Sequence, residues 1–308
     1  MTRLALIEPR TLIGEAVRNA LTQRRFPHAS IDLLTCTEEE VGAVTEVAGG
    51  AALVQAFDAA LVAAADVAIF CRPAVSESAL ADLEPTTRSV LIQPESVGAD
   101  WTVAVAGISD PAVLAGNRLI SPSPAVLLLA HLLAPLRDRA PIEVVAHVLQ
   151  PASTHDQTGL DDLFQQTRSI LSMSGSQAET VFGHQLAFNL LPWRGTDPDP
   201  AADLSALLGE GIRVYIHSSQ AGVFHGLSAA ISLKIAIDPG PEELRGVLLD
   251  QPLFEPAAEI DGLGPVSAAS SDKILLGEIR PAPPDRYWIW CAVDNLSLSA
   301  HNALALAL

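Results

Sequence analysis

The sequence is poor in basic residues and in cysteine, and each shortage excludes a class of function. Its 308 residues include 18 lysines and arginines against 36 aspartates and glutamates, which gives a net charge of −18. Because phosphate binding needs a basic face, neither nucleic acid nor an anionic membrane surface is expected as a partner. The cysteines, Cys36, Cys71 and Cys291, are three in number and far apart, so no disulfide framework and no metal site are expected. We expect all three to be core residues in a reducing compartment.

Basic and long apolar segments are also scarce near the first residues, so neither a secretory leader nor a membrane span is expected. The most apolar candidate, residues 51–70, is mostly alanine and contains Asp58 and Asp66. An acidic residue at a bilayer centre costs about 2.5–3.5 kcal/mol, so we expect a helix followed by a buried strand here. Hydrophobic residues make up 49% of the chain and charged residues 18%, which is enough apolar material for buried cores. The expected location is the cytoplasm.

The first third of the chain alternates short apolar runs with helical patterns. This alternation predicts an α/β domain with a Rossmann-like parallel sheet covered by helices. Strands are expected at 4–7, 31–35, 67–70, 89–93 and 103–107, and helices at 14–25, 56–64 and 77–83. A strong helix is expected over 121–140, with Ser123 as its N-cap and Pro124 at its first position.

From about residue 141 the strands become longer and alternate in polarity, which predicts an α+β domain whose mixed or antiparallel sheet has one exposed face. Strands are expected at 142–150, 213–221, 228–237 and 286–293, a helix at 161–173, a loop at 192–204 and a short apolar helix at the end. The predicted division is a first domain over 1–123, a second over 124–291 and a carboxy-terminal helix, 292–308, that packs back on the first.

The turn after the first strand has the position of a dinucleotide-binding turn but not its glycines. Strand, tight turn and helix begin such a domain, and the glycines let the backbone approach the pyrophosphate. Here Glu8 and Thr11 replace the first two, Pro9 removes a backbone donor, and a carboxylate about 4 Å from a phosphate costs about 4 kcal/mol at a protein surface. Nucleotide binding is therefore expected to be weak or absent, and the remaining candidates for cofactor contact are Arg10, Thr11, Gly14 and Arg72.

Several segments resemble one family in their order and spacing, the aspartate-semialdehyde dehydrogenases. "SPSPAV" (121–126) is similar to the family's "NPNCST", "LAFNLLP" (186–192) to "FAFNVIP", and "DNLSLSAHNA" (294–303) to its last helix. The resemblance implies a Rossmann-like domain and a dimerisation domain. It also implies hydride transfer to NADP through a cysteine thioester, with a histidine as acid–base and an arginine on the substrate carboxylate.

The positions that carry the family's chemistry are replaced. The nucleophilic cysteine falls on Pro124, the histidine on Leu227 and the arginine on Gln220. Proline and leucine transfer no proton and form no thioester, and glutamine cannot make the charged, bidentate contact of arginine. The pocket candidates that remain are Ser123, Gln150, which matches the family's pocket glutamine, Gln220, and His225, which an alternating strand would place on the same face as Leu227.

A narrower resemblance is to the Usg-like sister group, whose members have altered active sites. The segment "QAGVFHGLS" (220–228) is similar to that group's "QAPVFFGDS". Three functions stay open. The first is a catalytically inactive homologue that acts as a homodimer, or as a heterodimer with an active homologue. The second is a residual or repurposed enzyme, and the third is a sensor of an anionic metabolite anchored by Arg10 and Arg72. No cofactor is expected, although the resemblance implies NADP.

Overall fold

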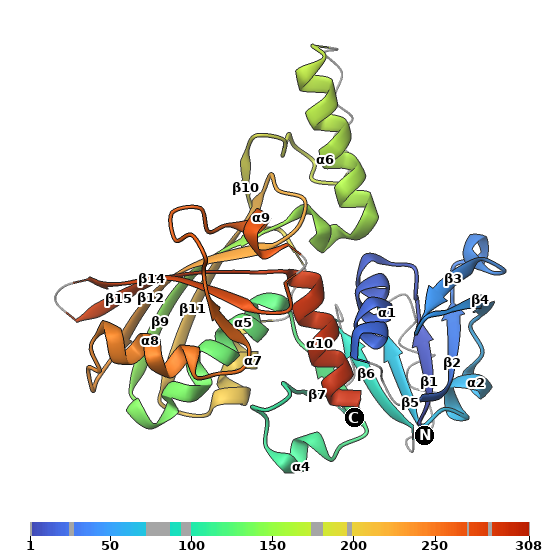
Figure 1. Ribbon diagram of the computed structural model, residues 1–308, viewed down its shortest axis with the longest axis horizontal. Helices are drawn as coiled ribbons and strands as arrows, with labels where there is room; N and C mark the ends of the chain where they lie inside the picture. Colours follow the sequence, from blue (N-terminus) through green and yellow to red (C-terminus); the bar gives the residue numbers. More distant parts are fainter. Residues whose placement is uncertain are drawn as a thin grey trace. The chain divides into compact units, whose positions relative to one another are not determined.

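The chain folds into two compact units, which a computed structural model describes over residues 2–24, 28–71, 87–93, 100–173, 181–195, 199–269, 271–282 and 285–307. The first unit holds residues 1–123, 196–199 and 296–308. The second unit holds residues 124–195 and 200–295. Figure 1 labels the helices and strands of both units.

The first unit is built on a mostly parallel sheet. Its described strands are β1 (Thr2–Ile7), β2 (His28–Thr35), β3 (Val44–Val47), β4 (Gly50–Ala56), β5 (Val67–Phe70), β6 (Arg88–Ile92), β7 (Thr102–Val103) and β8 (Arg118–Ser121), and their order is β3-β4-β2-β1-β5-β6-β8-β7. Only the β3–β4 pair is antiparallel among these strands. Without the edge strands β3 and β7, the order is that of a Rossmann sheet, and its switch point lies between β1 and β5.

Helices cover both faces of this sheet. The described helices of the first unit are α1 (Leu12–Arg24), α2 (Ala59–Ala63), α4 (Pro111–Leu114) and α10 (Asn295–Ala307). The apolar sides of α1 and α10, including Val17, Leu21 and Leu304, are buried in one core with Leu6 and Ile69. α2 contributes Val62 to a second core on the opposite face. Alternate residues of β1 and β5 therefore serve the two cores, as in a doubly wound fold.

The carboxy-terminal helix is held to the first sheet by polar side chains as well as by its core. The Asn302 side chain donates to the Ala104 carbonyl at 3.3 Å and to the Ser121 hydroxyl at 2.8 Å, and it accepts from the Ala106 amide at 2.9 Å. Arg88 donates to the Leu306 carbonyl near the end of α10. These bonds satisfy backbone groups that a helix end and a loop would otherwise leave unpaired.

The second unit is built on a mixed sheet. Its described strands are β9 (Ile142–Gln150), β10 (Leu190–Pro192), β11 (Ile212–Ala221), β12 (Leu227–Ile235), β13 (Phe254–Pro256), β14 (Ile274–Ala282) and β15 (Arg286–Val293), and their order is β10-β11-β9-β12-β15-β14-β13. β11 is parallel to β9, and β13 is parallel to β14, whereas the other pairs are antiparallel.

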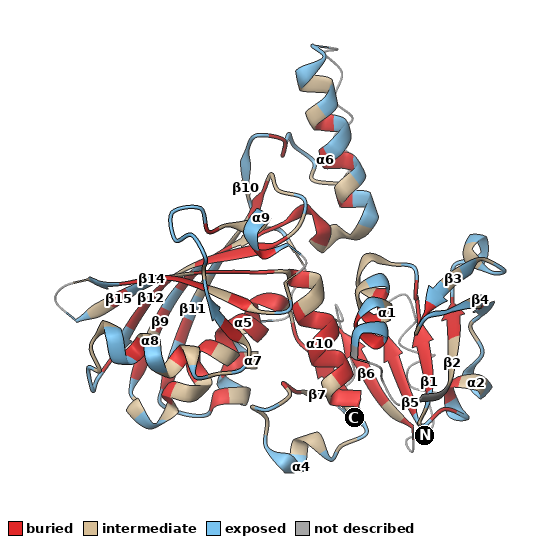
Figure 2. Cartoon of the chain, in the orientation of Figure 1, coloured by how far each residue is buried: buried red, intermediate tan, exposed pale blue. Residues whose placement is uncertain are grey.

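Helices cover one face of this second sheet, and a short helix with its preceding loop packs on part of the other face, against Trp290 and Ala292. The described helices are α5 (Pro124–Leu133), α6 (Asp156–Leu171), α7 (Pro200–Leu208), α8 (Pro241–Leu249) and α9 (Pro265–Ala268). α5 is almost wholly buried, as Figure 2 shows; α7 contacts α5 and β11, and α8 contacts β14. On the other face Val145, Tyr215 and Trp288 are 44–53% exposed, and we call this the open face. α6 projects away from the sheet (Figure 1).

The predicted fold class is confirmed, and most predicted elements are present. The strands expected at 142–150 and 286–293 are β9 and β15 at the same bounds, and the apolar carboxy-terminal segment is a helix. The helix expected at 77–83 lies outside the described residues. In the part of the chain that the structure describes, no helix is both long and apolar enough to cross a membrane.

Three predicted elements are wrong in part. The helix expected at 56–64 is shorter, α2 over Ala59–Ala63, because residues up to Ala56 form strand β4, whose pairing with β2 and β3 outweighs the helix propensity of alanine. The strand expected at 103–107 ends at Val103, and Gly107 adopts φ 77°, which breaks an extended chain. The loop expected at 192–204 contains the start of α7. The sequence reading also missed the β3–β4 hairpin altogether.

Candidate functional site

Glu8 closes the turn that follows β1. Its backbone is left-handed, with φ 58°, and its side chain is only 2% exposed. The carboxylate accepts a hydrogen bond from the Cys36 amide at 2.7 Å and one from the Thr35 hydroxyl at 3.0 Å, both at the carboxyl end of β2. In a dinucleotide-binding domain an acidic side chain near this strand end bonds the ribose of the ligand. In this chain the Glu8 carboxylate, which comes from the turn after β1, accepts the hydrogen bonds of the donors at the end of β2.

Thr11, Gly14 and Pro9 of the turn are also paired within the chain. The Thr11 hydroxyl donates to the Glu8 carbonyl at 2.9 Å and accepts from the Gly14 amide at 3.1 Å, and Arg18 donates to the Pro9 carbonyl at 2.9 Å. The Gly14 amide is thus directed at a side chain of the same turn, where a dinucleotide turn directs such amides at phosphate. Of the predicted cofactor contacts, Arg10 is exposed, Thr11 and Gly14 hold the turn closed, and Arg72 lies outside the described residues.

Gly14 keeps a packing role that does not depend on a cofactor. A Cβ atom at this position would lie 2.4 Å from the Glu8 carbonyl oxygen and 2.7 Å from the Pro9 carbonyl carbon. Real Cβ contacts are never that short, so only glycine allows the helix to start this close to the turn. The last glycine of the turn is therefore explained by helix packing alone.

None of the three cysteines has the environment of a nucleophile. Cys71 and Cys291 are buried, as expected, but Cys36 is exposed and not a core residue. Burial raises the pKa of Cys291 to about 12 and that of Cys71 further still. Partial burial raises the pKa of Cys36 to about 11, and the neighbouring Glu8 carboxylate adds to the shift. Because the thiolate is the nucleophile, all three are unreactive near neutral pH.

Helix α5 begins without a nucleophile. Pro124 is its first residue, as expected. The predicted N-cap bond is not made, because the buried Ser123 hydroxyl oxygen has no hydrogen-bond partner among the described residues. Leu227 is fully buried in β12, paired with Val293 of β15. These positions carry no group that forms a thioester or transfers a proton.

The second unit brings Gln150 and Gln220 together. They occupy matching positions at the carboxyl ends of the parallel strands β9 and β11, and both are buried. The Gln220 side-chain amide donates to the Gln150 carbonyl at 3.0 Å. Its side-chain oxygen lies 3.1 Å from Nε2 of His155, in the short helical turn Ala152–His155 that follows β9. The sequence reading missed His155, because it lies 65 residues from Gln220 and only the strand register shows the contact.

His155 is a neutral, partly buried imidazole. Burial lowers its pKa below the ordinary value, and the bond to Gln220 raises the pKa partly back. With Gln220 as acceptor, Nε2 of His155 carries the proton and Nδ1 keeps a lone pair. Phe182 meets the ring edge-on at a centroid distance of 5.2 Å, and the Trp193 ring centroid lies 5.7 Å away. This group of Gln150, Gln220, His155, Phe182 and Trp193 is called the Gln220 cluster below.

His225 does not belong to the Gln220 cluster. The prediction that it shares a strand face with Leu227 is wrong, since β12 begins at Leu227 and His225 lies in the preceding bend. Gly226, with φ 85°, separates the two and breaks the alternation. The Gly226 amide donates to Asn295 at 3.1 Å, and Asn295 also donates to Ser153 at 3.1 Å, so this bend is fixed beside η3 (Ala152–His155).

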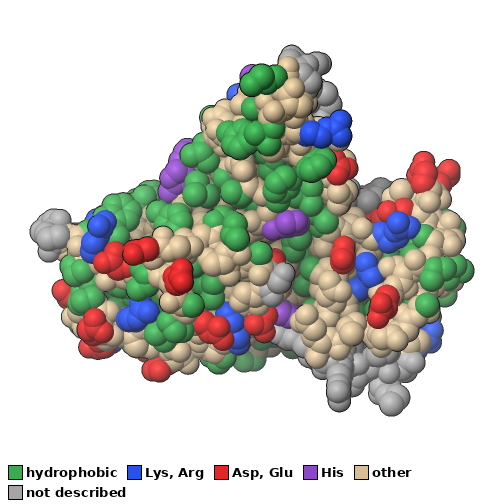
Figure 3. All heavy atoms as spheres, turned by 45° about the horizontal axis from the view of Figure 1, so that its top comes forward, with side chains coloured by type: hydrophobic (Ala, Val, Ile, Leu, Met, Phe, Trp, Pro, Cys, Tyr) green, Lys and Arg blue, Asp and Glu red, His purple; other side chains and the backbone are tan. Residues whose placement is uncertain are grey.

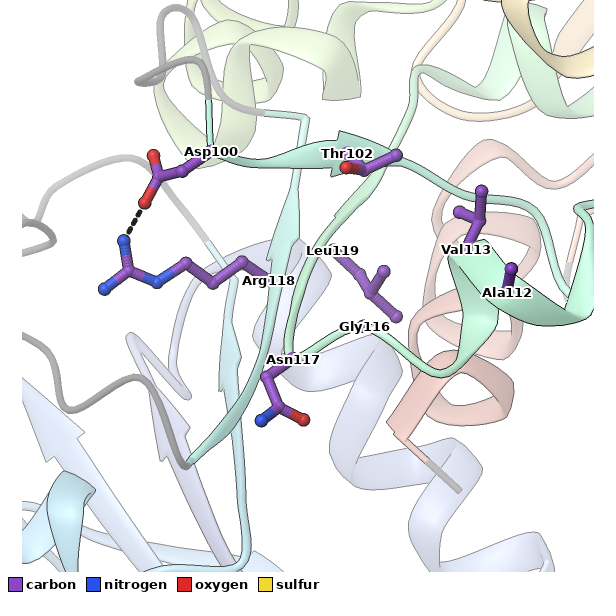
Figure 4. A pocket seen from close by; sticks show the side chains of 8 residues that line it. All are labelled: Asp100, Thr102, Ala112, Val113, Gly116, Asn117, Arg118 and Leu119. Atoms are coloured by element: carbon purple, nitrogen blue, oxygen red, sulfur yellow. Dashed lines mark hydrogen bonds and ion pairs between the residues drawn. The ribbon is translucent and has the colours of Figure 1, made fainter.

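A shallow cavity of about 450 Å³ lies at the β7–β8 edge of the first sheet. In Figure 4 Arg118 and Asp100 point toward each other, and they form an ion pair. The Arg118 guanidinium also lies 5.8 Å from the ring centroid of Trp101. Because its cationic group is paired with a carboxylate, this cavity is not built to hold an anion. On the face drawn in Figure 3, acidic and basic side chains of the described residues are interspersed.

Comparisons with known proteins match the resemblance predicted from sequence. No family model matches the chain. The aspartate-semialdehyde dehydrogenase of Rickettsia bellii is 24% identical over 199 residues, covering 60% of this chain and 59% of that protein. The Aquifex aeolicus enzyme is 25% identical over 209 residues, and the match covers 61% of each chain. The matched regions thus span about three-fifths of the length of these curated relatives.

Solved structures are similar over nearly the whole chain. A probable aspartate-semialdehyde dehydrogenase from Pseudomonas aeruginosa superposes with a TM-score of 0.87 at 24% identity, covering 99% of this chain and 97% of that one. Aspartate semialdehyde dehydrogenase II from Vibrio cholerae superposes with a TM-score of 0.86 at 21% identity, covering 100% and 97%. The chain has the aspartate-semialdehyde dehydrogenase fold. The predicted resemblance to this family is confirmed, whereas the narrower Usg-like resemblance stays a prediction.

Proposed function

We propose that this chain is a catalytically inactive, Usg-like member of the aspartate-semialdehyde dehydrogenases that acts in the cytoplasm through protein association. The observation that carries the proposal is the Glu8 carboxylate, which is buried in the turn and bonded to Thr35 and Cys36. A dinucleotide phosphate at this turn would meet a like charge, at a cost of about 4 kcal/mol at 4 Å. The loss of the cysteine at Pro124 and the histidine at Leu227 supports the same conclusion.

The open face of the second sheet is the proposed association surface, and a second copy of the chain is its proposed occupant. Val145 and Tyr215 expose apolar area on the neighbouring strands β9 and β11, and Trp288 exposes more on β15, one strand beyond β12. Glu143 and Arg286 form an ion pair on the same face. A twofold axis brings the same patch of two copies together, so an exposed apolar face of this kind suits a homodimer.

Enzyme assays and sedimentation test the two parts of the proposal separately. With aspartate semialdehyde, phosphate and NADP, we expect no NADPH above the rate without protein. In sedimentation equilibrium we expect a dimer that Trp288→Glu dissociates, whereas Val44→Glu, an equally charged change on exposed strand β3 of the first unit, leaves it intact. Turnover would contradict inactivity. A monomeric wild-type chain would contradict self-association and direct the search to a heterodimer with an active homologue.

The Gln220 cluster favours one second candidate, a repurposed enzyme that uses no nicotinamide. A neutral histidine with a lone pair on Nδ1, beside two aromatic rings, is the type of group that acts as a general base. The test is a screen of small carbonyl and ester substrates with wild-type protein and His155→Gln. Turnover that this variant abolishes would favour the second candidate, and its absence leaves the association role.

A further inference from the structure

Two histidines lie side by side on the open face of the second sheet. His147 of β9 and His217 of β11 occupy matching positions in the parallel pair, and both are exposed in the single chain. Their ring centroids are 5.3 Å apart. Val145 and Tyr215 form the matched pair two residues earlier on the same strands. A second copy that covers Val145 and Tyr215 therefore also covers the two imidazoles.

Uncharged side chains surround the two imidazoles on this face. Because every second residue of a strand points to the same face, the register gives the neighbours of both rings along and across the strands. These neighbours are Val145, Leu149, Tyr215, Ser219, Ala230 and Trp290. The Ser219 hydroxyl oxygen lies 3.0 Å from Nε2 of His147. Since a hydroxyl both donates and accepts, this bond forms whether Nε2 carries a proton or not, and it does not neutralise a protonated ring.

The charged groups around this face give the imidazoles no acidic partner. Arg213, Glu143 and Lys234 occupy matching positions on β11, β9 and β12, and the first two lie four residues from the histidines of their strands. Glu143 forms an ion pair with Arg286, and the Lys234 ammonium forms one with Asp285. The other exposed charged side chains of the flanking segments are Arg194, Glu278 and Arg280. Within the described residues neither imidazole forms an ion pair, so protonation adds positive charge to a face that already carries more cations than carboxylates.

We propose that His147 and His217 are a pH switch of association, an inference that rests on the homodimer proposed above: two copies associate when both rings are neutral and separate when the rings take up protons. Histidine is the side chain whose charge ordinarily changes between pH 5 and 8. Burial between two copies disfavours a charged ring that has no acidic partner, and two protonated rings 5.3 Å apart also repel each other. Association therefore releases the bound protons, and it weakens as the pH falls.

This direction is opposite to the one that the overall charge predicts. The chain has a net charge of −18, so acidification reduces the repulsion between two copies. Without the two histidines, association should thus be unchanged or stronger at low pH. The sign of the pH dependence separates the switch from a general charge effect.

Sedimentation equilibrium of the full-length chain at about pH 8 and at about pH 5.5, at one ionic strength, tests the switch. The readout is the ratio of the dimer dissociation constants at the two pH values. We expect a rise of at least about 10-fold for the wild-type chain at the lower pH, because each ring must release its proton to be buried. The double variant His147→Gln with His217→Gln should lose this rise, and each single variant should show a smaller one. His184→Gln, an exposed histidine outside the sheet, is the matched control and should behave like wild type.

The outcomes separate the switch from the homodimer, once circular dichroism confirms that each chain is folded at both pH values. A rise that the double variant loses and His184→Gln keeps supports the switch. A wild-type dimer with equal dissociation constants at the two pH values would overturn the switch and leave the homodimer standing. A rise that persists in the double variant would also overturn it, because other groups would then carry the titration. A wild-type chain that is monomeric at both pH values would overturn the homodimer and the switch together.

Discussion

The turn after β1 and the Gln220 cluster lie in different units, and their polar groups are used differently. In the turn, the Thr11 hydroxyl accepts from the Gly14 amide, and the Glu8 carboxylate accepts from the Cys36 amide at the end of β2. In the Gln220 cluster, His155 keeps one ring nitrogen without a bond to Gln220. Polar groups of the turn are thus bonded within the first unit, whereas the Gln220 cluster keeps a ring nitrogen that Gln220 does not engage.

The largest expected effect comes from filling the space at Gly14. Gly14→Ala places a Cβ against the Glu8 and Pro9 carbonyl groups, and we expect a loss of about 3 kcal/mol in the free energy of unfolding. Urea unfolding measures this loss. The matched control is Gly246→Ala in α8, where a Cβ meets nothing within 4 Å and the helix should gain up to about 1 kcal/mol. Equal changes in the free energy of unfolding for Gly14→Ala and Gly246→Ala would contradict the close packing of Gly14 against the turn.

Removing the Glu8 carboxylate should destabilise the first unit by about 2 kcal/mol, because the Thr35 hydroxyl and the Cys36 amide lose their acceptor. Glu8→Gly should be more stable than Glu8→Ala by about 1 kcal/mol, since the residue has φ 58° and glycine tolerates this region. Chemical denaturation of both variants measures which has the larger free energy of unfolding. If Glu8→Ala were as stable as wild type, the carboxylate would not hold the turn closed.

Substitution of Gln220 should change the free energy of unfolding only slightly, and its clearer effect should be on the pKa of His155. Gln220→Leu removes the acceptor of His155, and we expect a loss of about 1 kcal/mol because water can replace this bond at a partly buried ring. The bond to Gln220 raises the pKa of His155, so its removal should lower that pKa further. NMR titration measures the change. His131 of α5, whose pKa burial lowers to about 4, is the internal control and should not shift.

The sequence predicts the strands and helices of this molecule better than the hydrogen bonds between side chains that are far apart in the chain. The alternation of apolar and polar residues predicts β9 and β15 at their observed bounds, because one face of each strand is buried and every second residue is therefore apolar. Strand β4 was missed because alanine carries little information on burial and favours helices. The replacement of glycine by Glu8 is visible in the sequence. The bonds of the Glu8 carboxylate to Thr35 and Cys36 depend on the β1–β2 register, which the sequence does not show. The contact of His155 with Gln220 depends in the same way on the β9–β11 register.

The most direct test of the central claim, that the turn is closed to dinucleotides, is calorimetric titration of the wild-type protein with NADP and with NAD up to millimolar concentrations. The buried Glu8 carboxylate and the internally paired turn predict no saturable heat for either nucleotide. Saturable binding of either nucleotide, weakened by Gly14→Ala, would place the ligand at this turn and contradict the account.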